Sequence, residues 1–545
     1  MKSTWFIAAA ATLACCVGCV SENNELGGNL IPANHIYKVV TTDAMEVPVS
    51  MKMSDSLSAY SSTRITIGAI RNDEEFGLST RSSCVTLVPM FIDELDFGTN
   101  PVFRQFHFSA IADSISVCDL NQSNTLQSVF VHELSEPLDS DYLTYCKTQP
   151  AHGSELITTN VPVIGPGDSL SFNFTKAFGE KYLGITADDL KDIKSYTKRF
   201  PGIHITTNEP VGRGGRFNIF QLQLQYDSDY GYLAGSYAEL KFKSTWNIDG
   251  EDVTKDSSFF FYFSPTDFYD LDSLFNKSGT GSFPQYCANV TGDASASFVG
   301  DAGDYIYVDG GGGVKPCFSA KVLRQKAIDA IAANGHDPKK AIINKASLTM
   351  HYLPSDENFE QMHKVPQILN PTCRIKTSDT TFTYMGLTDA SDSNEDQGDI
   401  HRAQMTYSPD ITYHLQTLLG LDDDNAQLAA GSYDIWMLIQ HNDVITTTTS
   451  GNAEASEYYN YLAYQSMMGN MYGGYGYGGY GYGSYYSNYY NYAMMAQMYG
   501  SSSTSSKTQA NLDRDRYYYC KLYGPTAADP ELRPKFSFTY SIPNE

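Results

Sequence analysis

The sequence lacks the short motifs that mark the commonest catalytic sites. H-E-x-x-H, G-x-S-x-G and G-x-x-x-x-G-K-[ST] are absent, which leaves zinc-peptidase, α/β-hydrolase and P-loop chemistry without their signatures. The segment 132–136, His-Glu-Leu-Ser-Glu, lacks the second histidine of a helical zinc site. The four glycines at 310–313 lead into Val-Lys-Pro, so a tight turn is expected there and not a phosphate-binding loop. We therefore expect a protein that is not an enzyme and holds no cofactor.

Basic residues are scarce. The chain of 545 residues has 37 Lys and Arg against 62 Asp and Glu, a formal net charge of −25. Such an excess of negative charge repels phosphate backbones and anionic lipid headgroups, which excludes nucleic acid as an expected partner. The many carboxylates also give no means of choosing a glycosidase acid/base pair from the sequence alone.

Closely spaced cysteine pairs are missing downstream of the N-terminal segment. The seven cysteines beyond residue 19 are far apart and form no C-x-x-C, so neither a zinc cluster nor a dense disulfide framework is indicated. Buried free thiols are the expectation. They are Cys84, Cys118, Cys146, Cys287, Cys317, Cys373 and Cys520.

Long hydrophobic runs are also absent. The longest apolar stretch is short, lies near the N-terminus and predicts export. Lys2 precedes an apolar stretch at 5–14, which is shorter than the ~20 residues of a membrane-spanning helix and is typical of a cleaved signal peptide at 1–18. Cys16-Val17-Gly18-Cys19 resembles a bacterial lipobox, so Cys19 is the expected acylation site, with palmitate as the expected chain; Cys16 is the competing site. Residues 19–35 are polar and turn-rich, which suits a tether. The resulting prediction is a protein anchored by lipid to the outer membrane, with the cell surface and the periplasmic face both open.

The remaining pattern predicts a mainly β fold. Short runs rich in β-branched and aromatic residues alternate with turn signals throughout, and helices are expected at 186–199, 319–333 and 409–419. A stretch rich in Asp, Ser, Gly and Pro at 264–285 suggests a boundary. We therefore expect two β-sandwich, jelly-roll-like domains at 36–275 and 285–545, each with one or two short helices.

A tyrosine–glycine segment interrupts the second expected domain at 452–508. Residues 458–500 contain no Asp, Glu, Lys or Arg, and alternating glycine prevents a packed core, so a disordered loop is predicted. Such a loop is a tolerated insertion at a hairpin tip. Alternatively, its tyrosines stack on sugars or other aromatic groups. The candidate binding residues are Tyr475, Tyr477, Tyr480 and Tyr482.

An acidic run at 389–399 offers a candidate calcium loop. Oxygen ligands recur there at alternate positions, as calcium requires, and the candidate ligands are Asp392, Asn394 and Asp396. The glycine position and ligand spacing do not match an EF-hand, and a solvated loop is the other interpretation. A second acidic group consists of Asp293, Asp301, Asp304 and Asp309.

Several segments together resemble a known family. They are Glu-Leu-Gly-Gly-Asn-Leu-Ile-Pro at 25–32, Glu-Glu-Phe-Gly-Leu-Ser-Thr at 74–80, Phe-Pro-Gly-Ile-His-Ile at 200–205, residues 307–314, and Arg-Pro-Lys-Phe-Ser-Phe-Thr-Tyr at 533–540. In this order they resemble the Bacteroidetes lipoprotein family called domain of unknown function 4270. The resemblance implies an outer-membrane lipoprotein and assigns no functional residues; the tyrosine–glycine segment departs from the family pattern.

Three functions are compatible with these observations. The leading hypothesis is a non-enzymatic lipoprotein that acts in glycan binding, in adhesion or as an accessory of an envelope complex. The alternatives are a surface glycan hydrolase and a fimbrial subunit. The expected partners of the protein are the outer membrane, which it reaches through the lipid anchor, and glycans or envelope proteins.

Overall fold

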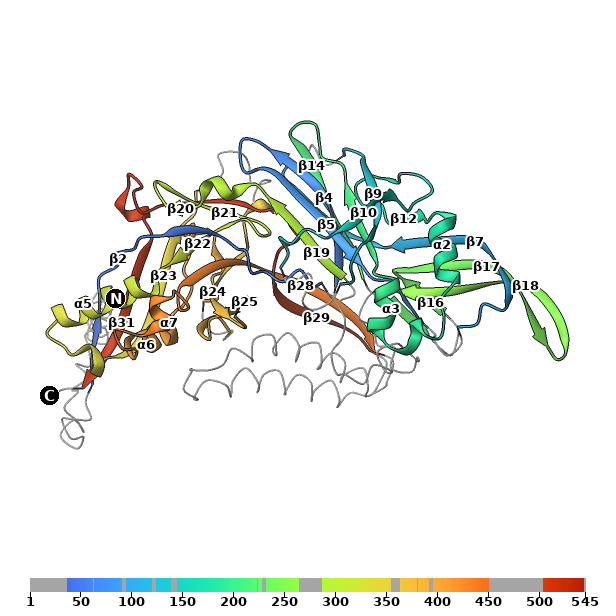
Figure 1. Cartoon of the computed structure of the whole chain (residues 1–545). Coiled ribbons are helices and arrows are strands. Elements are labelled where there is room, and N and C mark those ends of the chain that lie inside the picture. Colours follow the sequence, from blue (N-terminus) through green and yellow to red (C-terminus); the bar gives the residue numbers. More distant parts are fainter. Residues whose placement is uncertain are drawn as a thin grey trace, which may run out of the picture.

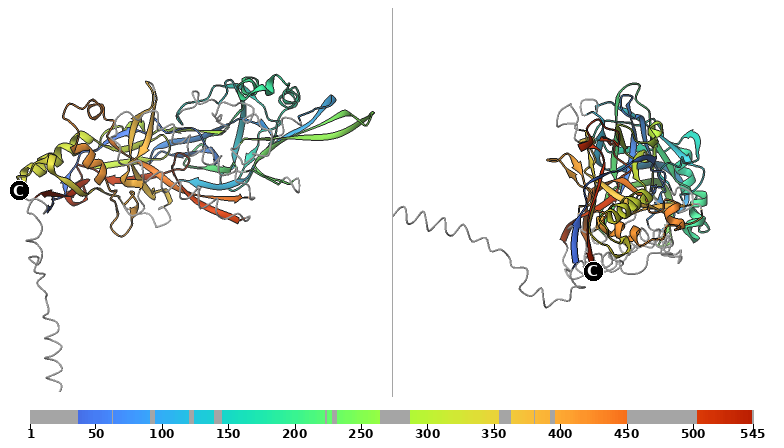
Figure 2. Two further views of the ribbon diagram at one scale, coloured as in Figure 1. Left: turned by 90° about the horizontal axis from the view of Figure 1, so that it is seen from below. Right: turned by 90° about the vertical axis from the view of Figure 1, so that its left-hand side faces the viewer.

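The computed structural model describes residues 37–61, 63–90, 95–119, 124–138, 145–222, 224–227, 232–263, 287–353, 363–379, 381–391, 396–449 and 503–543. This part of the chain is mainly β, with antiparallel strand pairs and a few short helices. The expected fold class is confirmed. Figure 1 shows an arched, elongated body, and the two views of Figure 2 agree with that shape.

The first half of the body is a sandwich of two sheets. The larger has the order β10-β9-β13-β5-β4-β14-β8, with β11 on β9 and β19 on β5. Its strands are β4 Arg64–Asn72, β5 Gly77–Val85, β8 Ala112–Val117, β9 Gln127–Leu134, β10 His152–Leu156, β11 Val163–Ile164, β13 Ile203–Thr207, β14 Gly214–Gln221 and β19 Cys287–Asp293. The facing sheet, in the order β12-β7-β17-β18-β6, consists of β6 Val88–Pro89, β7 Thr99–Ala110, β12 Leu170–Asn173, β17 Tyr237–Ile248 and β18 Glu251–Tyr262. A separate hairpin pairs β15 Leu224–Asp227 with β16 Tyr232–Gly235.

Alternating apolar residues of both sheets form the first core. Val129 and Val131 of β9 meet Phe106 and Phe108 of β7 in one buried cluster, as the period of two predicts. The short helices α2 Lys176–Leu183 and α3 Ile193–Arg199 pack on the same cluster. The sequence predicted one helix from 186; instead the turn η4 Asp189–Lys191 precedes α3, because the side chain of Asp192 caps α3 by accepting from the amide of Ser195.

The second half pairs another two sheets. One has the order β1-β31-β23-β27-β26, with β2 on β31, and the other has the order β20-β3-β22-β28-β24-β25, with β29 on β28. The first contains β1 Tyr37–Thr41, β2 Met45–Glu46, β23 Ile342–His351, β26 Ile400–His401, β27 Thr406–Tyr407 and β31 Lys535–Pro543. The second contains β3 Ser50–Met53, β20 Gly300–Asp301, β22 Val314–Phe318, β24 Ile368–Lys376, β25 Phe382–Gly386, β28 Ile435–Thr449 and β29 Ser503–Leu512.

Helices and short turns complete the second half. They are η5 Ser295–Phe298, α5 Ala320–Ala333, η6 Pro338–Lys340, η8 Asp389–Ser391, α6 Thr412–Leu419, α7 Ala426–Ala429 and η9 Pro530–Leu532. Helix α5 agrees with its predicted span and ends at Ala333; Asn334 is its C-cap, and Gly335 follows with φ of 78°. Helix α6 begins at Thr412 and not at 409, because Asp389 caps it: its carboxylate accepts from the amides of Tyr413 and His414 at 2.6 and 3.0 Å.

Strand pairing crosses the expected boundary in both directions. The segment that holds β1 to β3 pairs with β31, β22 and β20 of the second half, and β19 pairs with β5 of the first. The ranges 36–275 and 285–545 therefore do not coincide with the units of strand pairing. These partners lie hundreds of residues apart in sequence, so local pattern cannot reveal them.

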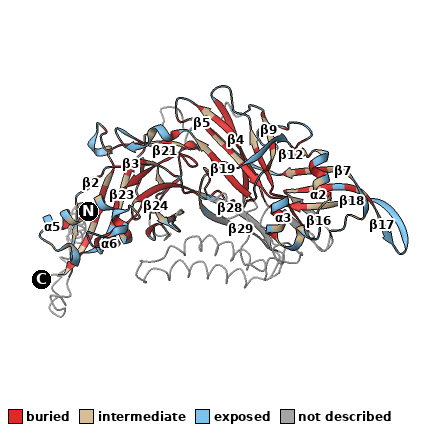
Figure 3. Ribbon diagram, in the orientation of Figure 1, coloured by how far each residue is buried: buried red, intermediate tan, exposed pale blue. Residues whose placement is uncertain are grey.

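The two ends of the body differ. At one end, β1 pairs with the C-terminal strand β31, from Tyr37 opposite Pro543 to Thr41 opposite Thr539. At the other end, the long hairpin of β17 and β18 projects from the body (Figures 1 and 2). Figure 3 shows its tip as exposed. Strand β1 therefore begins at the end opposite the hairpin.

The tyrosine–glycine segment connects two paired strands. β28 and β29 run antiparallel, with Thr449 opposite Ser503, so the segment is inserted at the tip of a hairpin. The predicted insert at 452–508 overlaps β29, which begins at Ser503. The remaining residues of the insert, with Tyr475, Tyr477, Tyr480 and Tyr482, lie outside the described residues.

Candidate functional site

Four tyrosines and a lysine share one face of a two-stranded sheet in the second half. The sheet pairs β21 Tyr305–Asp309 with β30 Tyr519–Tyr523, and its register places Tyr305 opposite Tyr523 and Tyr307 opposite Lys521. Alternate residues of a strand point to the same side. We define the tyrosine face as Tyr305, Tyr307, Tyr519, Lys521 and Tyr523. Strand β21 lies along the upper edge of the body in Figure 1.

The opposite side of this sheet is anchored in the second core. Ile306, Val308, Cys520 and Leu522 are all buried there, at 0–2 % exposure. The members of the tyrosine face are partly exposed, up to 39 % for Tyr305. From Tyr305 to Val308 and along β30, core and outer positions thus alternate, whereas Asp309, opposite Tyr519, is buried although its position is on the outer side.

Two phenylalanines close one end of the tyrosine face. Phe298 lies 4.4 Å from Tyr307 between ring centroids, and Phe76 lies 4.9 Å from Tyr519. These edge-on and tilted contacts fix the orientation of the two tyrosine rings. The end with Tyr305 and Tyr523 has no such cover among the aromatic contacts of the described residues.

Lys521 lies in the middle of the tyrosine face, and further polar groups lie beside Tyr305. The ammonium of Lys521 lies 5.6 Å from the ring centroids of both Tyr305 and Tyr307, within the range of a cation–π interaction. Asp304, next to Tyr305, accepts a hydrogen bond from the hydroxyl of Thr526 at 2.7 Å. Gly524 permits this closure, because a Cβ there would lie 2.0 Å from the carbonyl oxygen of Gly303.

A buried group of charges supports the sheet from the turn that follows β21. Arg81 of β5 donates to Asp293 of β19 at 2.8 Å, and both side chains are at most 1 % exposed. The Lys315 ammonium lies within 3.4 Å of the carbonyl oxygens of residues 310, 311 and 313. The charges therefore join the first sandwich to the glycine turn of the second.

Burial controls the protonation of this group. It raises the pKa of Asp309 to about 7, assisted by the nearby carboxylate of Asp293. It lowers the pKa of Lys315 to about 8, against the attraction of Asp309 and Asp293. The glycine at 313 is required, because a Cβ would lie 2.2 Å from an Asp309 carboxylate oxygen. Asp293 and Asp309, two members of the second acidic group found in the sequence, therefore belong to this buried group of charges.

The predicted calcium loop is only partly described. Asp392 and Asn394 lie outside the described residues. One Asp396 carboxylate oxygen accepts from the amides of Gly398 and Asp399, and the other contacts His401 at 2.6 Å. Across the described ranges, no three or more His, Cys, Asp or Glu residues are arranged as a metal site. Calcium binding by the loop stays a prediction.

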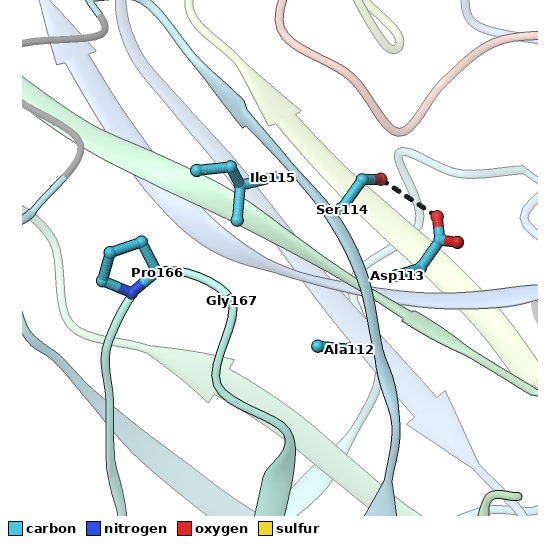
Figure 4. A pocket seen from close by; sticks show the side chains of 6 residues that line it. All are labelled: Ala112, Asp113, Ser114, Ile115, Pro166 and Gly167. Carbon is cyan, nitrogen blue, oxygen red and sulfur yellow. Dashed lines mark hydrogen bonds between the residues drawn. The ribbon is translucent and has the colours of Figure 1, made fainter.

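A shallow hollow of about 320 Å³ lies on the first half, between β8 and the loop at 166–167 (Figure 4). Its lining includes Asp113, Ser114, Ile115 and Pro166. The Ser114 hydroxyl donates to its neighbour Asp113 at 3.0 Å, and no histidine lines the hollow to activate it. The hollow therefore offers no nucleophile and base in catalytic arrangement.

The cysteine prediction is confirmed for the described chain. All seven of its cysteines are free and buried. Cys19, the predicted lipidation site, lies outside the described residues. Among the helices that the structure describes, none is long and apolar enough to cross a membrane.

Comparisons with known proteins add no relative: no family model, no curated protein and no solved structure matches the chain. The resemblance to domain of unknown function 4270 therefore stays a prediction that rests on the quoted segments. The tyrosine face was not predicted. Its sequence signal is the alternation Tyr-Ile-Tyr-Val-Asp at 305–309 and Tyr-Cys-Lys-Leu-Tyr at 519–523, but only the pairing of the two strands shows that the tyrosines meet.

Proposed function

We propose that this protein is an exported, non-enzymatic lipoprotein, tethered to the outer membrane through Cys19, that binds a glycan on its tyrosine face. The observation that carries the proposal is the row of partly exposed tyrosines on one side of a sheet, with Lys521 among them and with Asp304 and Thr526 beside Tyr305.

The chemistry of the tyrosine face fits a sugar. One side of a pyranose ring presents mainly C–H groups, which pack on a flat aromatic ring, and its hydroxyls need donors and acceptors at the ring edge. Tyrosine supplies both an apolar face and a polar tip, and it loses little conformational entropy on binding because it has two side-chain torsions. Lys521 offers donors within the tyrosine face, and Asp304 offers an acceptor beside Tyr305.

The arrangement of the body supports a tethered role. Strand β1, which the predicted tether at 19–35 precedes in the sequence, begins at the end opposite the β17–β18 hairpin (Figure 2). A lipid-anchored body would thus project the hairpin away from its attachment point.

A panel of soluble polysaccharides tests the proposal. The chain from residue 20 onward is run through native gels that contain one polysaccharide each, and retardation reports binding. The double variant Tyr305→Ala/Tyr523→Ala removes the open end of the tyrosine face. Tyr413→Ala is the matched control, because Tyr413 is 41 % exposed on α6 and lies outside the tyrosine face.

We expect at least one polysaccharide to retard the wild type and the Tyr413→Ala control, and to lose its effect on the double variant. Equal retardation of all three proteins would contradict a glycan site on the tyrosine face. Release of reducing ends from the retarding polysaccharide would contradict the non-enzymatic part and favour the hydrolase alternative. A protein partner would replace the glycan if no polysaccharide retards the wild type and if one envelope protein co-purifies with the wild type but not with the double variant.

A further inference from the structure

Three histidines from three neighbouring strands gather on the first sandwich, far from the tyrosine face in sequence. They are His132 of β9, His152 of β10 and His204 of β13. His132 and His204 are directly opposite each other in the β9–β13 register. The ring of His152 lies between theirs, with centroid distances of 4.8 Å to each.

Two of the rings have one nitrogen fixed by a backbone carbonyl. Nδ1 of His132 lies 3.0 Å from the carbonyl oxygen of Glu155, and Nδ1 of His152 lies 2.8 Å from that of Gly153. A carbonyl only accepts, so each Nδ1 carries the proton and each Nε2 has a free lone pair in the neutral ring. Metal-binding histidines typically have this arrangement, with the distal N–H donated to a carbonyl or carboxylate.

The third ring has a buried nitrogen that lacks a partner. His204 is 4 % exposed, and its Nε2 lies 3.0 Å from the hydroxyl of Ser82. Its Nδ1 is buried and has no hydrogen-bond partner within the described part of the chain. A buried unpaired ring nitrogen is unfavourable unless a ligand satisfies it.

The rings are stacked at interplanar angles of 33° and 42°, so their nitrogens do not yet converge, in agreement with the lack of a preassembled site in the described ranges. His152 lies on β10, whose residues are all exposed.

One further donor lies in the same row but is not included. Cys84 of β5 is opposite His204. The thiol of Cys84 is fully buried in an apolar cluster. The three imidazoles are therefore the donor set.

We propose that His132, His152 and His204 bind one divalent transition-metal ion of the zinc and nickel class when His152 turns its Nε2 toward the other two rings. Neutral imidazole is a suitable ligand for both metals. The ion would connect three strands, and it would fix the exposed β10 against β9.

Calorimetric titration of the tag-free chain from residue 20 onward, after removal of metal with a chelator, tests this site. Zinc and nickel are titrated separately into the wild type, His152→Ala and His107→Ala. His107 is the matched control, because it also lies on a strand of the first sandwich and its ring bonds Asn173 and Ser171 instead of another histidine.

We expect one ion per chain in the wild type and the His107→Ala control, and an affinity at least tenfold lower in His152→Ala. The melting temperature should rise with zinc in the same two proteins and not in His152→Ala. Because His152 is exposed, its replacement leaves the fold intact, which circular dichroism checks. The absence of saturable binding in the wild type would overturn the proposal, and so would equal affinity in His152→Ala.

Discussion

The buried ion pair of Arg81 and Asp293 should be critical for stability. The two side chains are 1 % and 0 % exposed and 2.8 Å apart. Arg81 also donates to the carbonyl oxygen of Asp515 at 3.2 Å, and Asp293 accepts from the amide of Gly312 at 3.0 Å. Removing one partner of a buried pair leaves an uncompensated charge and costs ~3–5 kcal/mol. We therefore expect Asp293→Ala to lower the free energy of unfolding by that amount.

Urea unfolding followed by tryptophan fluorescence measures the effect, because Trp246 and Trp436 report on the first and second halves. Arg213→Ala is the control: its pair with Glu74 is exposed, at 37 % and 79 %, and should contribute at most ~1 kcal/mol. The double variant Arg81→Met/Asp293→Ala should lose less than the sum of the single losses, because no unpaired charge is left. A loss of ~1 kcal/mol or less in Asp293→Ala would refute this account of the junction.

Three further predictions concern other buried groups. The pKa of Asp309 is raised to about 7 in the folded chain, above the ~3.9 of an unfolded aspartate. The stability that the protonated Asp309 carboxyl contributes is therefore fully present below pH ~4 and is lost as the pH rises to about 7. Asp309→Asn should abolish this loss, and urea midpoints at pH 4.5 and 7 measure it; equal pH dependence of both proteins would contradict the burial of an uncharged carboxyl. Asp389→Ala removes the cap of α6 and should cost ~1–2 kcal/mol, seen as a lower melting temperature, whereas Asp379→Ala, with a fully exposed side chain, should change little. The seven cysteine thiols of the described chain are buried, so an aromatic disulfide reagent should react with them only after denaturation; rapid reaction of the native protein would show that the core opens.

Much of the fold follows from local pattern. Helix α5 agrees with its predicted span, because apolar residues recur there with the period of a helix. The start of α6 could not be predicted, since its cap comes from Asp389, more than twenty residues earlier. Likewise, the pairing of β1 with β31 depends on contacts between the two ends of the chain.

The candidate sites also combine features that local sequence indicates with contacts that it does not. The sequence indicates tyrosines in abundance, and the most conspicuous ones lie at 472–482. It does not indicate that Tyr305 lies opposite Tyr523, because more than two hundred residues separate them. His132 and His204 are similarly far apart in sequence and become neighbours only through the register of β9 and β13.

The affinity of the tyrosine face for its glycan is the most direct test of the proposed function. Calorimetric titration compares the wild type, Tyr305→Ala and Tyr413→Ala with the polysaccharide that retards the wild type most strongly. Loss of one aromatic stacking contact of ~1 kcal/mol weakens binding about fivefold. We predict that loss for Tyr305→Ala and an unchanged affinity for Tyr413→Ala, and equal affinities of all three proteins would contradict a glycan site on this face.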